Sequence, residues 1–354
     1  PLLIDTTIDG KPRKIVAVPS KQGWLYCFDR ATGVPIWPIE EKPVPQSTMK
    51  YEETSKTQPF PSKPVPYGRT HVAENDLIDF TPALRAQALA NLKFFRWEPT
   101  PYVPPTGPES KLLGSINIAN TTGNTNWPGA GFDIETGIFY SHAHNSAVSV
   151  GHYDEEEFSK VSPENKGNRT PRWEAEPDYG RPRPAAAPGA APAAPAFGGN
   201  EGRRKLGEGL DGLPIVKPPY GVLSAIDLKN PDKLLFSVAH GETPDNIKNH
   251  PLLKGMNIPR TGQPGNAGVL ITKTMVVVGD PQVTTKNGQR GASVRAYDKM
   301  TGAEIGEVRV PAQVLGMPMT YSVDGRQYIV VGVSGGNYTG EYIAFRLPES
   351  DIKK

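Results

Sequence analysis

Residues 25–33 read Leu-Tyr-Cys-Phe-Asp-Arg-Ala-Thr-Gly, a strand-like run that ends in aspartate and enters a Thr-Gly turn before a second apolar run. The pattern returns in three further places, and a shortened copy lies near the C-terminus: 130–137, 222–230, 294–302 and 342–346. A hairpin unit repeated along a chain is typical of stacked or radial repeat architectures. The sequence therefore predicts an all-β fold, a β-propeller of four-stranded antiparallel blades, whose ligands bind near the centre of the array.

The composition agrees with a large all-β domain. The chain has 354 residues, 37% of them hydrophobic, and its 37 glycines and 38 prolines make up about a fifth of the total. Such a content favours many turns over long helices. A formal net charge of +2 does not favour nucleic-acid binding, and no apolar run approaches the roughly 18 residues that a membrane helix needs. The single cysteine, Cys27, excludes an internal disulfide.

Two long segments depart from the blade pattern. Residues 38–110 are a Pro-rich excursion with a short helix predicted at 84–95, and residues 154–218 contain a low-complexity Pro-Ala tract at 181–196. Such a tract buries too little apolar surface to offset the entropy lost on ordering it, so we expect a flexible insertion. At about 40–45 residues per blade, the remainder of the chain holds about four blades of one propeller domain spanning 1–354.

The repeats resemble those of the quinoprotein dehydrogenases, which use pyrroloquinoline quinone (PQQ) and have an eight-bladed propeller. Their pattern Ala-x-Asp-x-x-Thr-Gly-x-x-x-Trp is matched within residues 25–37, with Trp37 in place. Residues 41–46 and 57–60 resemble the branch of membrane glucose and quinate dehydrogenases. Residues 1–33 resemble the segment around the family's cofactor-contacting lysine, 122–127 its Gly-Gly-x-Asn-Trp loop, and 318–336 its final blade. The likeness covers nearly the whole chain except 154–218, and it implies the C-terminal half of such a ring.

The resemblance also implies cofactor contacts. Lys21, within Pro19-Ser-Lys-Gln-Gly23, matches the lysine whose ammonium would stabilise negative charge developing on the quinone oxygens. Asn126 and Trp127 match a cofactor loop, and Asn266 and Gly268 fall where the backbone meets the cofactor, although Asn-Ala stands where Trp-Gly or Gly-Gly is usual. The structural alternatives are a loop lysine in water, a turn asparagine and a core tryptophan.

In this family the catalytic aspartate precedes the segment that here begins at Pro1, and the calcium ligands come from the N-terminal half. We therefore expect a fragment that contacts PQQ but lacks the general base and the calcium ligands, and that is inactive in isolation. His142 and His144 stand at i, i+2 on one strand face, but a zinc site would need a third ligand, so we predict no metal ligands in this chain.

The implied reaction is oxidation of a sugar or alcohol hydroxyl to a carbonyl, with electrons passing to a quinone or another acceptor in the periplasm. The alternative function is a non-catalytic propeller that serves as a binding or assembly scaffold. An assembly propeller would share the blade repeat, but it would not be expected to keep both the Lys21 segment and the loop at 122–127.

Overall fold

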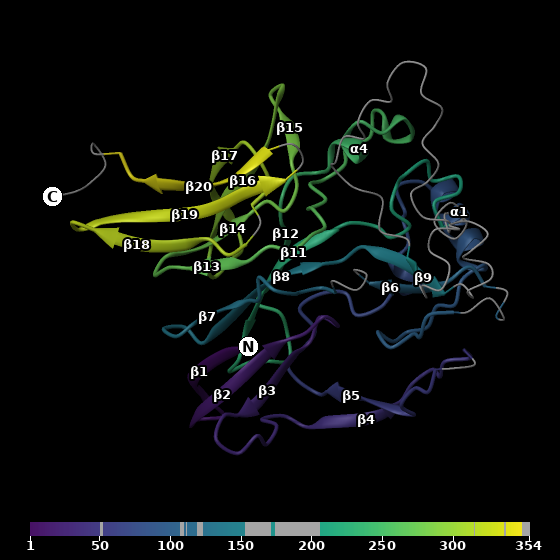
Figure 1. Ribbon diagram of the computed structural model, residues 1–354, viewed down its shortest axis with the longest axis horizontal. Helices are drawn as coiled ribbons and strands as arrows, with labels where there is room; N and C mark the ends of the chain where they lie inside the picture. Colours follow the sequence, from purple (N-terminus) through teal and green to yellow (C-terminus); the bar gives the residue numbers. More distant parts are fainter. Residues whose placement is uncertain are drawn as a thin grey trace.

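The structure is a computed structural model that describes residues 1–49, 52–106, 110, 112–118, 123–152, 171–173, 206–314, 316–335 and 338–348. In the described part of the chain the strands form six antiparallel sheets. Four of these sheets follow one another, from the purple N-terminal sheet to the yellow C-terminal sheet in Figure 1. The fold class predicted from the repeats is confirmed.

Three of these four sheets are built from strands that are close in sequence, whereas the second joins strands on either side of the insertion at 154–218. The first contains β1 (Leu2–Ile8), β2 (Lys11–Pro19) and β3 (Leu25–Asp29). The second contains β7 (Gly131–Asp133), β8 (Ile138–His144), β11 (Gly221–Asp227) and β12 (Phe236–Ala239). The third contains β13 (Val269–Ile271), β14 (Met275–Gly279), β16 (Gln289–Asp298), β17 (Glu304–Val310) and the short β15 (Thr284–Lys286). The fourth contains β18 (Met319–Val323), β19 (Arg326–Gly335) and β20 (Tyr338–Arg346).

The repeated Asp-x-x-Thr-Gly sequence is a turn with its own hydrogen bonds. The Asp298 carboxylate accepts from the backbone N–H of Met300 at 3.0 Å and of Thr301 at 2.8 Å, and from the Thr301 hydroxyl at 2.8 Å. Gly302 then takes a φ of +70°, which glycine adopts without steric cost. These bonds lower the pKa of Asp298. The motif therefore serves chain reversal, as the sequence predicts.

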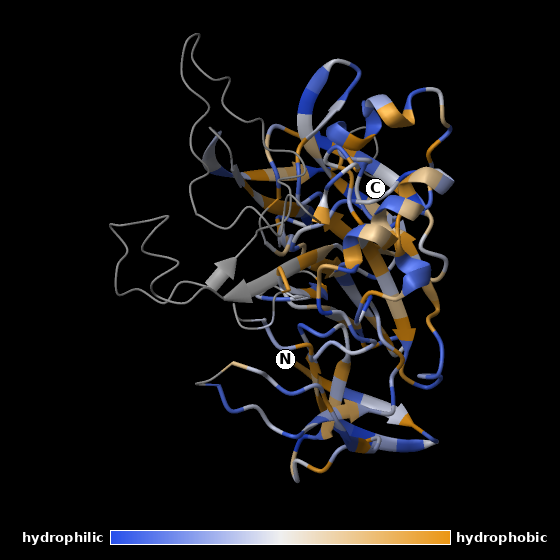
Figure 2. Ribbon diagram, turned by 90° about the vertical axis from the view of Figure 1, so that its right-hand side faces the viewer, coloured by the Kyte–Doolittle hydropathy of each residue, from blue (hydrophilic) through white to orange (hydrophobic). Residues whose placement is uncertain are grey.

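The buried cores lie between successive sheets. Inward residues of β1 and β2, such as Ile4 and Ile15, pack with Phe139 of β8 in one cluster. The opposite face of β8 packs through Tyr140 against Val276 and its neighbours in the third sheet. Because β8 lies inside the stack, all seven of its residues are buried, whereas β1 alternates between buried and exposed positions. Figure 2 shows the apolar stretches along the strands inside the molecule.

The excursion at 38–110 contains structure of its own. Its hairpin, β4 (Ile39–Pro43) with β5 (Thr57–Pro61), was not predicted from the sequence. The predicted helix is α1 (Pro82–Leu92), which begins after Thr81 because the threonine hydroxyl accepts from the Leu84 N–H at 3.1 Å. A 3₁₀ turn, η1 (Glu74–Asp76), precedes it.

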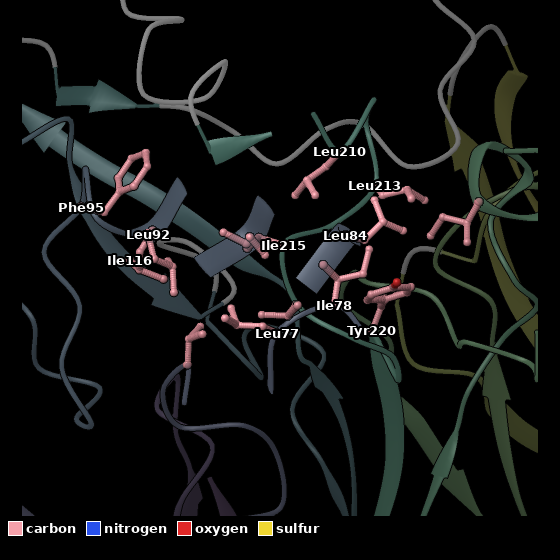
Figure 3. Close-up of a cluster of buried hydrophobic side chains, with 14 of the residues drawn as sticks. Leu77, Ile78, Leu84, Leu92, Phe95, Ile116, Leu210, Leu213, Ile215 and Tyr220 are labelled. Atoms are coloured by element: carbon pink, nitrogen blue, oxygen red, sulfur yellow. The ribbon is translucent and has the colours of Figure 1, made fainter. Parts of the chain in front are cut away.

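A further cluster of buried side chains lies around α1. Figure 3 shows Leu84 and Leu92 beside Leu210, Leu213 and Ile215. Residues 206–218, at the end of the predicted insertion, are thus packed, while the Pro-Ala tract lies outside the described residues. The remaining elements are β6 (Ser115–Ile118), β9 (Ala147–His152), β10 (Pro171–Trp173), α4 (Asp245–Lys248) and η5 (Pro251–Leu253). Within the described ranges, none of the helices has the length and apolar character required for a membrane crossing.

Candidate functional site

The strand order places the predicted cofactor contacts at one end of the blades. The turns at 29–33 and 298–302 follow the third strand of their sheets, and the turn at 133–137 follows the first. Because neighbouring strands run antiparallel, turns after first and third strands lie at the same end. The β2–β3 loop and the segments that lead into β7 and β13 lie at the opposite end. That end carries Lys21, the loop around Asn126, and Asn266.

Lys21 lies at the wall of a pocket of about 230 Å³. Its lining residues come from the β2–β3 loop, the excursion, β6 and the segment that leads into β7: Lys21, Gln22, Thr70, Pro101, Val103, Pro105, Asn117, Ile118, Gly123 and Asn124. The described lining residues include a cation, amides and a hydroxyl, but no Asp, Glu or His. The pocket can therefore hold an anionic, hydrogen-bonding ligand, whereas a general base must come from other residues.

Asn124 holds the segments of this pocket together. Its backbone N–H donates to the Lys21 carbonyl at 2.9 Å, and its side-chain Nδ2 donates to the Arg69 carbonyl at 2.8 Å and to the Lys21 carbonyl at 3.3 Å. Its own carbonyl accepts from the His144 N–H at 3.0 Å. Asn124 was not singled out from the sequence, although it stands two residues before the predicted Asn126, because the partners of its side chain lie 55 and 103 residues away.

The other predicted contacts do not line the pocket. Asn126 is half-buried in a turn, where its carbonyl accepts from the Gly129 N–H at 3.0 Å, and the side chain of Trp127 is 69% exposed. The Asn266 Oδ1 is enclosed and has no hydrogen-bond partner among the described residues. Gly268 packs closely on the segment that leads into β18, because a Cβ there would stand 2.4 Å from Cγ of Met317. Of these five positions only Lys21 lines the pocket, and the cofactor contact of all five remains a prediction.

A buried polar network, which sequence reasoning missed, lies behind the loop that leads into β13. His240 contacts the Tyr297 hydroxyl at 2.8 Å and the Gly279 carbonyl at 3.0 Å through its two ring nitrogens. Its carbonyl accepts from the Gln263 N–H at 2.8 Å, which ties the loop to the network. Arg295 and Asp280, both without exposed side-chain surface, form a two-bonded ion pair at 2.7 and 3.1 Å. Burial lowers the pKa of His240 well below its usual value and raises that of Asp280.

The two histidines of β8, His142 and His144, are buried in the interior of the protein. The ring of His142 lies 5.2 Å from the ring of His240, and burial together with the neighbouring His144 lowers the pKa of His142 to about 3. His142 is therefore neutral at ordinary pH. Over the described part of the chain, His, Cys, Asp and Glu form no group of three or more that could hold a metal ion.

The family is now defined by comparison. The model of the PQQ β-propeller domain of glucose, ethanol and alcohol dehydrogenases matches residues 1–329. The chain therefore belongs to the PQQ-dependent quinoprotein dehydrogenase family, as the repeats and the Lys21 segment imply.

Its relatives act on different substrates by name. The chain is 28% identical over 362 residues to a probable quinate dehydrogenase (quinone) of Xanthomonas campestris pv. juglandis, covering 99% of this chain and 41% of that protein. It is 28% identical over 375 residues to the quinoprotein glucose dehydrogenase of Escherichia coli, covering 100% of this chain and 41% of that protein. The solved quinohemoprotein alcohol dehydrogenase of Comamonas testosteroni is similar with 20% identity and a TM-score of 0.47, covering 94% and 33% of the two chains. The chain thus spans about two fifths of the length of these curated relatives.

Proposed function

We propose that this chain is the Lys21-bearing part of a PQQ-dependent dehydrogenase that oxidises the hydroxyl of a sugar, polyol or alcohol to a carbonyl. The observation that carries the proposal is the pocket at Lys21. It lies at the loop end of the blades, within the region that matches the PQQ propeller. In the overall reaction the carbinol group loses two electrons and two protons, one hydrogen from the hydroxyl oxygen and one from the carbon, and the electrons pass on to a quinone or another acceptor.

The residues of the pocket fit an acidic quinone. Lys21 supplies a cation, Asn117 and Gln22 supply amides, and Thr70 supplies a hydroxyl, while Val103 and its proline neighbours form an apolar wall. PQQ, when bound, supplies a two-electron acceptor with carboxylates and carbonyl oxygens. Lys21 would hold such an oxygen and stabilise negative charge on it. Asn126, Trp127, Asn266 and Gly268 belong to the proposal as further cofactor contacts.

The proposal assigns neither the general base nor a calcium ligand to the described residues. The lining of the pocket contains no carboxylate or imidazole, and a proton acceptor is needed for the substrate hydroxyl. We therefore expect no PQQ-dependent dye reduction by the 354-residue chain with glucose or alcohols and calcium. Turnover by that chain would show that another of its residues accepts the proton. A periplasmic location is proposed on the family likeness alone.

The experiment is a titration of the purified chain and of its Lys21→Met variant with PQQ, in which binding is measured by equilibrium dialysis. Loss of a hydrogen bond to a charged group weakens binding by about ten- to a hundredfold, so Lys21→Met should weaken PQQ binding to that extent. Lys11→Met, which removes an exposed lysine from β2, is the matched control. Equal affinity of the chain and Lys21→Met would remove the cofactor role of Lys21. Absence of any PQQ binding would favour the scaffold function instead.

A further inference from the structure

We propose that Asn124 is a positioning residue for Lys21, acting by fixing the backbone of the β2–β3 loop through its side-chain amide. The inference rests on the proposed cofactor role of Lys21. It names a residue that lines the same pocket and that would act on the cofactor through Lys21, by fixing the direction in which Lys21 enters the pocket.

The hydrogen bonds define the polarity of this contact. The Lys21 carbonyl accepts from both the backbone N–H and the Nδ2 of Asn124, and the Arg69 carbonyl accepts from the same Nδ2. Since carbonyls only accept, the NH₂ side of the amide must face them. Asn124 is 1% exposed, so these bonds are sheltered from water. The side chain joins the first sheet to the excursion, and the backbone joins both to the segment that leads into β7.

The surrounding glycines show how closely the three segments approach. A Cβ at Gly123 would stand 2.3 Å from Cβ of Lys21, and a Cβ at Gly68 would stand 2.4 Å from Oδ1 of Asn124. At Gly23 the nearest atom would be Nδ2 of Asn124, at 3.0 Å. Each of the three segments thus has a glycine at the point where it approaches the Asn124 side chain or Lys21. Such packing leaves room for one side chain of the size of asparagine and holds it in one orientation.

Two substitutions separate shape from hydrogen bonding. Asn124→Leu keeps the branching at Cγ and adds volume, and it removes both donors. Asn124→Asp keeps the shape but replaces the NH₂ by an oxygen that would face the carbonyls of Lys21 and Arg69. Both variants should therefore release the β2–β3 loop. Asn257→Leu, at an exposed asparagine of another loop, is the matched control.

The first measurement is a double-mutant cycle on PQQ affinity, with PQQ and calcium added to the full 354-residue chain. If Asn124 acts through Lys21, Asn124→Leu weakens PQQ binding by roughly tenfold in the native background and by less than about twofold in the Lys21→Met background. A purely structural role would produce the same loss in both backgrounds. Equal losses, or no loss in the native background, would overturn the positioning role.

The second measurement needs no cofactor. Hydrogen–deuterium exchange should rise by roughly tenfold or more in peptides covering 20–24, 67–70 and 123–126 of Asn124→Leu, because a buried hydrogen-bonded contact is lost there. Exchange in 319–335 should stay unchanged, and Asn257→Leu should match the native chain. Unchanged exchange at 20–24 would overturn the inference. If the native chain binds no PQQ but the exchange rises as expected, the proposed function fails while the restraint of the loop by Asn124 stands.

Discussion

Arg295 offers the sharpest test of how the third sheet is held together. Its guanidinium has no exposed surface and donates twice to Asp280, whose carboxylate is also fully buried. Glu304 accepts at 3.1 Å and Glu242 at 3.2 Å, and both are partly exposed. Replacing Arg295 by Met preserves much of the volume but removes the cation. Asp280 is then left as a buried carboxylate without its partner.

The expected loss follows from that geometry. Removing one member of a buried ion pair destabilises a protein by about 3–5 kcal/mol, since the remaining charge is desolvated and unpaired. Arg290→Met is the control, because Arg290 is 42% exposed and lies 3.8 Å from Asp245. A surface pair of that kind contributes about 1 kcal/mol or less. The two arginine variants should therefore differ by at least about 2 kcal/mol.

The assay is urea unfolding followed by tryptophan fluorescence. The double variant Asp280→Asn/Arg295→Met removes the unpaired carboxylate and should recover part of the loss, about 1–3 kcal/mol relative to Arg295→Met. If Arg295→Met unfolds within about 1 kcal/mol of Arg290→Met, or if the double variant is no more stable than Arg295→Met, the reasoning from buried charge is refuted.

The pH dependence of the free energy of unfolding tests the burial of Asp280 independently. Burial raises the pKa of Asp280 above 3.8, and Arg295 opposes that rise. Between the unfolded and folded pKa values the folded state holds more protons than the unfolded state, so the free energy of unfolding falls as pH rises through that window and is constant above it. The fall should be larger in Arg295→Met, because the opposing cation is gone, and absent in the double variant. A free energy of unfolding that rises with pH in this window would contradict the assignment.

Two further outcomes test the packing. Gly123→Ala and Gly10→Ala both place a Cβ on a residue with φ near +70°, which costs about 1–2 kcal/mol, but only the Cβ at Gly123 meets Lys21. In urea unfolding, Gly123→Ala should therefore lose more free energy of unfolding than Gly10→Ala, by about 1 kcal/mol or more. Equal losses would contradict the close approach of Gly123 to Lys21. On the outer face of the fourth sheet, Tyr342 is 86% exposed and Val323 is 48% exposed. The native chain should therefore self-associate in sedimentation velocity experiments, and Tyr342→Glu should reduce that association. A monodisperse native monomer would contradict this prediction.

Local features of the fold could be predicted well from the sequence. The Asp298 turn depends on residues within four positions of one another, so its aspartate, threonine and glycine can be recognised by spacing alone. The helix at 82–92 likewise has its cap at Thr81, next to its first turn. The hairpin of β4 and β5 was missed because both of its strands contain proline and neither carries an alternating apolar pattern.

The sequence by itself determined the repeat and the all-β class, and it predicted Lys21 as a cofactor contact, since each is carried by short stretches with a defined chemistry. Tertiary structure alone decided that Asn124, 103 residues from Lys21, restrains the Lys21 loop, and that Trp127 lies exposed. It also decided that the Arg295 guanidinium meets Asp280 across paired strands. Such contacts depend on strand register and on which sheets stack. Those are set by the burial of whole faces, and no short stretch of sequence encodes them.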